Sequence, residues 1–192
     1  MTVFDRAYEA TPSWEIGRPQ TAVVRLADAG LAAGTVLDVG CGTGQNALEL
    51  AGRGLAVTGI DGAALAIARA QAAAAERGLP AEFLVLDALR LADLGRTFDT
   101  LLDVGLFHWL QPGDRPSYAA SLRTAVRPGG TCLLVCWSDR NPFGIGPGRV
   151  RRRDIRSAFR DGWRVESIQP ETLDTRLPMG RVEAWLATIR AT

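Results

Sequence analysis

The stretch from Thr35 to Asn46 reads TVLDVGCGTGQN, and it places an apolar run directly before three closely spaced glycines. An apolar run of this length predicts a buried strand, and the glycines predict a tight loop that opens a helix. A strand, a glycine loop and a helix N-terminus together let the backbone approach a cofactor closely. The stretch therefore predicts a cofactor-binding loop at the end of the first strand of an α/β sheet.

An acidic residue stands at the end of the next apolar run, where AVTGID finishes with Asp61. The spacing of about 20 residues between loop and acid is typical of a carboxylate that accepts hydrogen bonds from a ribose diol. The alternative role of Asp61 is an N-cap for the helix that begins at Ala63, and this role is compatible with ribose binding. We expect it to hold the ribose of a nucleoside cofactor.

The spacing of the glycines distinguishes between cofactors. A dinucleotide loop is written G-x-G-x-x-G, whereas this chain has its third glycine one residue early and Gln45 where the pattern requires glycine. The run from Val36 to Gly44 instead resembles motif I of the class I S-adenosylmethionine (SAM)-dependent methyltransferases. That resemblance implies SAM as the methyl donor and S-adenosylhomocysteine (SAH) as the product. The cofactor-binding residues that it assigns to this stretch are Asp38, Gly40, Cys41, Gly42 and Gly44.

Apolar runs alternate with helical stretches along the chain, which predicts a doubly wound α/β fold. We predict strands at 35–39, 56–60, 82–86, 100–104, 131–137, 164–168 and 183–189, and helices at 44–53, 63–77, 114–126 and 153–159. Residues 141–148, rich in glycine and proline, are expected to form a loop. The resemblance implies a Rossmann-like, seven-stranded sheet that is mostly parallel, with an antiparallel last strand and helices on both faces. One domain is expected to span residues 1–192.

Two more acidic residues close predicted strands. Asp87 ends the third strand. The family resemblance implies that its carboxylate accepts a hydrogen bond from the adenine amino group and that the backbone amide of Ala88 contacts a ring nitrogen. The alternative is an ordinary aspartate in a turn. Gly62, after Asp61, is assigned to a thin wall of the same pocket. Asp103 ends the fourth strand and is placed near the methionine amino group of the cofactor. We assign it to binding and not to catalysis, because methyl transfer removes the positive charge it would face.

His108 is the one histidine of the chain and follows Asp103 by five residues. Its ordinary pKa lies near neutral pH, so it is a candidate general base. The alternative is a histidine packed at the rim of the pocket and hydrogen-bonded to a backbone carbonyl. The predicted acceptor pocket consists of Trp14, Phe107, His108, Trp109 and Trp137.

The N-terminal residues 1–33 are predicted to cover the cofactor and the acceptor. Within them, TPSWEIGRPQ (11–20) sets tryptophan and isoleucine between prolines, which predicts a stiff apolar segment, and Trp14 is also assigned to cofactor binding. This segment resembles PW-x-x-G of the thiol, halide and thiopurine methyltransferase branch. The stretch FDTLLDVGLFHWLQPGDRPSY (98–118) is similar to the thiopurine branch as well. Val104 stands where thiopurine enzymes have arginine, which favours a smaller or more apolar acceptor.

Composition sets the remaining expectations. A chain of 192 residues with 47% hydrophobic residues builds one ordinary core, and no run is long enough to cross a membrane. We expect a cytoplasmic protein with three reduced, buried thiols, no metal site and no membrane partner. The net charge of +1 gives no general attraction to nucleic acid. Arginines gather at 149–160, where a solvated helix is favoured over a phosphate-binding patch.

These observations favour a SAM-dependent methyltransferase acting on a small molecule through sulfur, nitrogen, oxygen or halide, as a monomer or homodimer. A SAM-binding protein without turnover is the first alternative, because the cofactor loop would look the same. An NAD-dependent oxidoreductase is the second, and Gln45 argues against it.

Overall fold

The computed structural model describes residues 3–142, 144 and 146–192, and within them seven strands form one sheet. The order of the strands is β3-β2-β1-β4-β5-β7-β6. β1 to β5 run parallel to one another, while β7 is antiparallel to both β5 and β6. The strands are β1 (Thr35–Val39), β2 (Ala56–Asp61), β3 (Glu82–Val85), β4 (Phe98–Val104), β5 (Val126–Trp137), β6 (Trp163–Asp174) and β7 (Arg181–Ala191).

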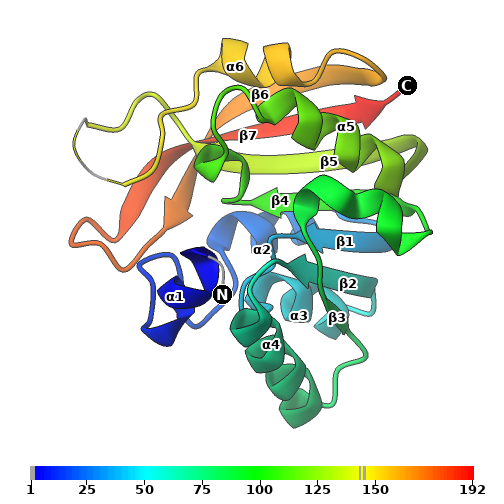
Figure 1. The fold of residues 1–192 in the computed structure, drawn as a ribbon, viewed down its shortest axis with the longest axis vertical. Coiled ribbons are helices and arrows are strands. Elements are labelled where there is room, and N and C mark those ends of the chain that lie inside the picture. The colour runs from blue at the N-terminus through cyan, green and yellow to red at the C-terminus, as the bar shows by residue number, and fades with distance from the viewer. Residues whose placement is uncertain (1–2, 143, 145) are drawn as a thin grey trace.

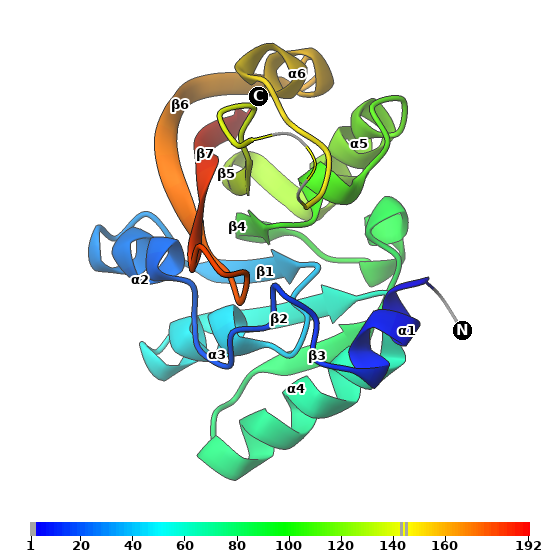
Figure 2. The ribbon, with the colours of Figure 1, turned by 90° about the vertical axis from the view of Figure 1, so that its left-hand side faces the viewer.

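Helices cover both faces of this sheet (Figures 1 and 2). The helices are α1 (Val3–Glu9), α2 (Thr21–Asp28), α3 (Gln45–Gly52), α4 (Ala64–Arg77), α5 (Arg115–Ala125) and α6 (Arg152–Ala158), with the 3-10 turns η1 (Ala88–Leu94) and η2 (Phe107–Trp109). The predicted seven-stranded, doubly wound fold with an antiparallel last strand is therefore confirmed.

The strands alternate their side chains between two hydrophobic cores, as the period of two requires. Val36 and Leu102 point to the face where α2, α3 and α4 pack. Leu37 and Leu101, one residue away on the same strands, point to the face covered by α5 and α6. The three cysteines are buried and unbridged, as expected.

Several predicted boundaries were wrong. β5 begins at Val126, five residues earlier than predicted, because Val126 pairs with Phe98 across an irregularity in the β4 ladder. β6 has 12 residues and β7 has 11, so both are longer than predicted. They pair with each other as a hairpin that extends past the apolar residues from which the strands were predicted. The sequence did not predict α1, α2 or the two 3-10 turns. Residues 143 and 145 of the predicted loop lie outside the described residues.

No helix in the described part of the chain is both long and apolar enough to cross a membrane.

Candidate functional site

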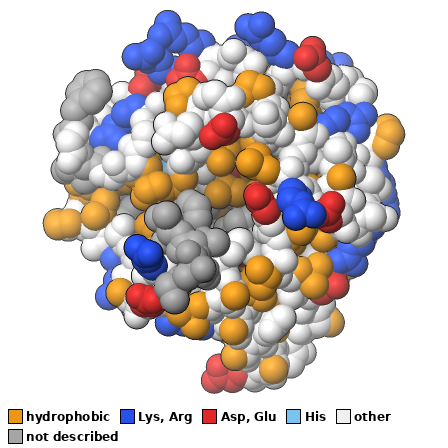
Figure 3. All heavy atoms as spheres, in the orientation of Figure 1, with side chains coloured by type: hydrophobic (Ala, Val, Ile, Leu, Met, Phe, Trp, Pro, Cys, Tyr) orange, Lys and Arg blue, Asp and Glu red, His pale blue; other side chains and the backbone are white. Residues whose placement is uncertain are grey.

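A cleft of about 610 Å³ opens at the carboxyl ends of the parallel strands. In Figure 1 the arrowheads of β2 and β4 point toward the side where α1 lies. Figure 3 shows hydrophobic side chains gathered around the middle of the face seen in Figure 1, with single charged side chains among them. The carboxyl edge of a parallel sheet is where open α/β folds bind ligands, so this cleft is the candidate site.

The glycine loop forms one wall of the cleft. The backbone N–H groups of Gly40 and Cys41 donate to the carbonyl of Ile60 at 2.8 and 2.9 Å, which fixes the loop to the end of β2. Gly42 has a φ of +56°, and a Cβ there would lie 2.8 Å from the Tyr8 hydroxyl. Only glycine therefore fits between the loop and the N-terminal segment that packs against it.

Asp61 lies where the sequence predicted, at the tip of β2 and inside the cleft. One carboxylate oxygen accepts the N–H of Gly42 at 3.0 Å, and the other accepts the N–H of Ala63 at 2.8 Å. Each oxygen has a second lone pair, so a bound diol can be accepted without breaking these bonds. The carboxylate thus links the glycine loop, the start of α4 and the cleft.

Asp87 and Ala88 line the cleft beside the end of β3, and Gly62 borders it with open space where a side chain would stand. Asp87 accepts the N–H of Leu89 at 2.9 Å and begins the turn η1. The turn role considered in the sequence analysis is therefore present, together with a position facing the cleft.

Four predicted site residues do not line the cleft. Asp103 is fully buried, and its carboxylate accepts the Tyr118 hydroxyl at 2.7 Å and the N–H of Leu106 at 2.9 Å. These internal donors occupy the carboxylate that we had assigned to the cofactor. The others are Asp38, Gly44 and Phe107.

Phe107 was wrongly assigned to the acceptor pocket. Its ring is buried in the core, 6.0 Å from the ring of Phe159 and 6.3 Å from that of Tyr118. Phe107 and His108 are consecutive residues of the turn η2, and only His108 and Trp109 line the cleft. No sequence pattern predicted this turn, which determines whether Phe107 or His108 faces the cleft.

Asp38 is a buried carboxyl group whose Oδ2 has no hydrogen-bond partner among the described residues. Burial, together with the charges of Asp103 and Asp61, raises the pKa of Asp38 to about 8. The group is therefore mostly protonated at neutral pH and supports the first strand from beneath the cleft.

A raised pKa predicts how stability depends on pH. The folded protein binds the Asp38 proton more tightly than the unfolded chain, so this contribution is complete below pH 3.8 and is lost as pH rises through about 8. Between pH 6.5 and 8.5 we expect the wild-type denaturation midpoint in urea to fall, and that of Asp38→Asn to stay nearly constant. Asparagine keeps an oxygen for the Ala47 N–H that Asp38 accepts. Parallel curves for the two proteins would contradict this assignment.

His108 is held as a neutral hydrogen-bond donor. Its Nδ1 accepts the N–H of Trp137 at 3.1 Å, which places the ring proton on Nε2. Burial, with a smaller contribution from the charge of Arg115, lowers the pKa of His108 to about 3. This geometry matches the packed alternative, although the ring accepts a backbone N–H and, within the described residues, does not donate to a backbone carbonyl as predicted. It argues against a general base, because Nε2 has no lone pair for an acceptor's proton.

The N-terminal segment lines the cleft beside the glycine loop. Trp14 donates through Nε1 to the Tyr8 hydroxyl at 3.2 Å, and its ring lies 5.3 Å from that of Trp109 in an edge-on arrangement. The Thr43 hydroxyl donates to the Glu15 carboxylate at 2.6 Å. These contacts join the segment to both the glycine loop and the turn η2.

A second attachment lies at the other end of the segment. Buried Asp174, at the end of β6, accepts the Thr21 hydroxyl at 2.6 Å and pairs with Arg18 at 3.1 Å and Arg181 at 2.9 Å. Burial opposes the charge of Asp174, yet the bonds from Thr21 and the arginines hold its pKa well below the usual range. Tyr8, Glu15, Thr43 and Asp174 were not predicted as site residues. Glu15, Thr43 and Asp174 act through partners distant in the sequence, and Tyr8 is placed by its contact with Trp14.

The cleft residues fit SAM. The loop leaves its backbone close to the cleft, Asp61 offers carboxylate oxygens for a ribose, and Asp87 stands beside a wall that suits an adenine ring.

The Methyltransferase domain family matches residues 36–130. A 2-heptyl-1-hydroxyquinolin-4(1H)-one methyltransferase from Mycobacteroides abscessus is 36% identical over 168 residues, which cover 85% of this chain and 74% of that protein. The chain belongs to the class I SAM-dependent methyltransferases.

Other relatives of this methyltransferase agree with the assignment. A structure solved in work on the "Conversion of a Disulfide Bond into a Thioacetal Group during Echinomycin Biosynthesis" is 36% identical, with a TM-score of 0.90 over 98% of this chain and 90% of that one. A probable thiol methyltransferase 2 from Arabidopsis thaliana is 29% identical, over 77% of this chain and 66% of that protein. SAM is the cofactor, and the NAD-dependent alternative is rejected.

Proposed function

We propose that this methyltransferase transfers the methyl group of SAM to a flat, largely apolar small molecule through an oxygen, sulfur or ring nitrogen that is already deprotonated. The observation that carries the proposal is the cluster of Trp14, Trp109 and Trp137 around one part of the cleft. Aromatic walls of this kind favour flat apolar ligands. The Mycobacteroides abscessus relative is named for 2-heptyl-1-hydroxyquinolin-4(1H)-one, a flat ring system with a hydroxyl on its nitrogen, which supports the same class of acceptor.

The cleft contacts divide the work between two groups of residues. Asp61, Asp87, Ala88 and the loop from Gly40 to Thr43 would hold SAM, which supplies an electrophilic methyl group on a sulfonium. Trp14 and Trp109 would hold the acceptor and exclude water, because the N-terminal segment lies against the glycine loop. Positioning and exclusion of water account for most of the rate enhancement in such a displacement.

Neither Tyr8 nor His108 supplies a base. Burial raises the pKa of Tyr8 far above neutral, so it stays a phenol. His108 has a lowered pKa and would instead donate its Nε2–H to an acceptor oxygen or sulfur. An acceptor with an acidic hydroxyl or thiol therefore fits this pocket better than an alcohol.

This assignment predicts the pH profile. The enzyme is expected to show no inflection near pH 6.5 that depends on His108, because the imidazole stays neutral across pH 5–8. Rates with an aromatic thiol should follow the ionisation of the thiol in both the wild type and His108→Gln. An inflection near pH 6.5 that the substitution abolishes would restore His108 as a base.

The acceptor class is tested with isotope-labelled SAM against a hydroxylated quinoline, a thiophenol, an alkanethiol and iodide. We expect transfer to the two aromatic acceptors and little to iodide. Turnover of iodide or the alkanethiol alone would contradict the aromatic pocket. Tight SAH binding without turnover of any acceptor would favour the non-catalytic alternative.

A further inference from the structure

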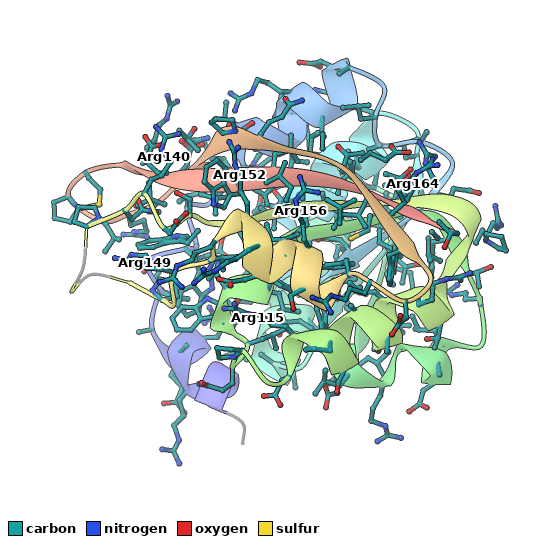
Figure 4. All side chains as sticks on the ribbon, turned by 90° about the horizontal axis from the view of Figure 1, so that it is seen from above. Arg115, Arg140, Arg149, Arg152, Arg156 and Arg164 are labelled. Carbon is teal, nitrogen blue, oxygen red and sulfur yellow. The ribbon has the colours of Figure 1, made fainter. Side chains whose placement is uncertain are left out.

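A second cavity, of about 360 Å³, lies where α5 begins and the chain approaches α6. It shares no lining residue with the cofactor cleft. Figure 4 shows Arg115 and Arg149 near one another at this place, at the start of α5 and in the loop before α6. Its lining consists of Pro112, Arg115, Asp139, Arg149, Arg151 and Asp154.

Arg115 is a buried cation with too few partners. Its side chain is 6% exposed, and its Nε has no hydrogen-bond partner among the described residues. The guanidinium lies over the ring of Phe107 at 5.0 Å, and Asp154 approaches it only to 4.0 Å. A buried guanidinium is strongly unfavourable unless an anion or several acceptors face it.

The two aspartates of the cavity are engaged elsewhere. Asp154 accepts the backbone N–H of Arg151 at 2.9 Å, and Asp139 accepts the indole N–H of Trp185 at 3.2 Å. Arg149 donates to the carbonyl of Pro147 at 2.8 Å and to that of Asn141 at 3.2 Å. Its contribution to the cavity is therefore mainly its positive charge, because its N–H groups already have backbone acceptors. Three arginines against two aspartates leave the lining positive by one charge.

We propose that this cavity binds a small oxyanion, such as a phosphate or carboxylate group, between Arg115 and Arg151. The anion would accept from the buried Arg115 guanidinium and balance the excess charge of the lining. The first turn of the 11-residue helix α5, which begins at Arg115, adds its positive end to the same space. The site thus falls at the arginine-rich segment, although the sequence pattern favoured an ordinary solvated helix there.

The test uses the full chain saturated with SAH, so that the cofactor cleft is occupied. Sodium phosphate is titrated in a calorimeter at constant ionic strength held with chloride, and acetate is titrated in a second arm. We expect saturable 1:1 binding of phosphate, acetate or both. Loss of one charge-assisted hydrogen bond corresponds to about tenfold or more in affinity, so Arg115→Gln and Arg151→Gln should each weaken binding by that factor.

Arg156→Gln is the matched control, because Arg156 is exposed on α6 and does not line the cavity. Its affinity should equal that of the wild type. Absence of saturable binding in both arms would overturn the proposal, as would affinities unchanged in both test variants. Circular dichroism checks the fold of Arg115→Gln, and if that variant is unfolded, Arg151→Gln decides alone.

Discussion

Replacing Asp61 with alanine is expected to weaken SAH binding by about 100-fold. Two charge-assisted hydrogen bonds from a ribose diol contribute together about 3 kcal/mol, which corresponds to that factor. The substitution also removes the acceptors for the N–H groups of Gly42 and Ala63, so the loop keeps its backbone bonds to Ile60 but loses the side-chain contact with the end of β2. Isothermal titration of SAH into the wild type and the variant measures the loss.

Two further variants separate binding from structure. Asp61→Asn keeps one oxygen acceptor but loses the charge, and we expect an affinity between those of the wild type and Asp61→Ala. Asp28→Ala removes a carboxylate that pairs with Arg53 on the surface, and it should bind SAH normally. An Asp61→Ala variant that binds SAH within threefold of the wild type would exclude Asp61 from the cofactor site.

The positions of the parallel strands along the chain could be predicted because each of them carries its own local signal. Val36 and Leu37 belong to opposite faces, yet both are apolar, as a strand covered on both sides requires. The extended hairpin of β6 and β7 could not be predicted to its full length. Residues such as Glu171 and Arg181 are polar and join the ladder only because a partner strand lies alongside.

Part of the cleft lining could be predicted from the sequence, whereas the burial of Asp103 and Phe107 could not. Asp61 and Asp87 follow directly from their places at strand ends. Asp103 has the same kind of place, but Tyr118, 15 residues later, donates to its carboxylate from α5. A contact between side chains of two different elements leaves no periodic pattern in the sequence. The same holds for the hydrogen bond between Thr43 and Glu15.

Gly44 shows that one residue of a binding motif can serve packing alone. It has a φ of +80° at the start of α3 and does not line the cleft. A Cβ there would lie 2.7 Å from the Phe83 ring and 2.9 Å from the Cβ of Ala70. The third glycine therefore lets α3 and α4 pack closely against β2 and β3, a role like that of the last glycine in dinucleotide loops.

Gly44→Ala is accordingly expected to destabilise the fold by about 2 to 5 kcal/mol. The left-handed backbone costs an alanine roughly 1 to 2 kcal/mol, and overpacking adds about 1 to 3 kcal/mol. Gly54 is the matched control: it follows the same helix with a φ of +87°, and no atom lies within 4 Å of a Cβ there. Gly54→Ala should therefore lose only the backbone share, about 1 to 2 kcal/mol. Urea denaturation of both variants measures the difference.

The packing share can be isolated further by shrinking the ring that alanine would meet. A double-mutant cycle combines Gly44→Ala with Phe83→Leu. The double variant should lose about 1 kcal/mol less free energy of unfolding than the sum of the losses of the two single variants. Leucine has no ring edge at the Phe83 position, so part of the clash disappears while the backbone cost at residue 44 remains. Additive losses, or equal losses for Gly44→Ala and Gly54→Ala, would show that Gly44 is required for its backbone conformation and not for the close approach of Phe83.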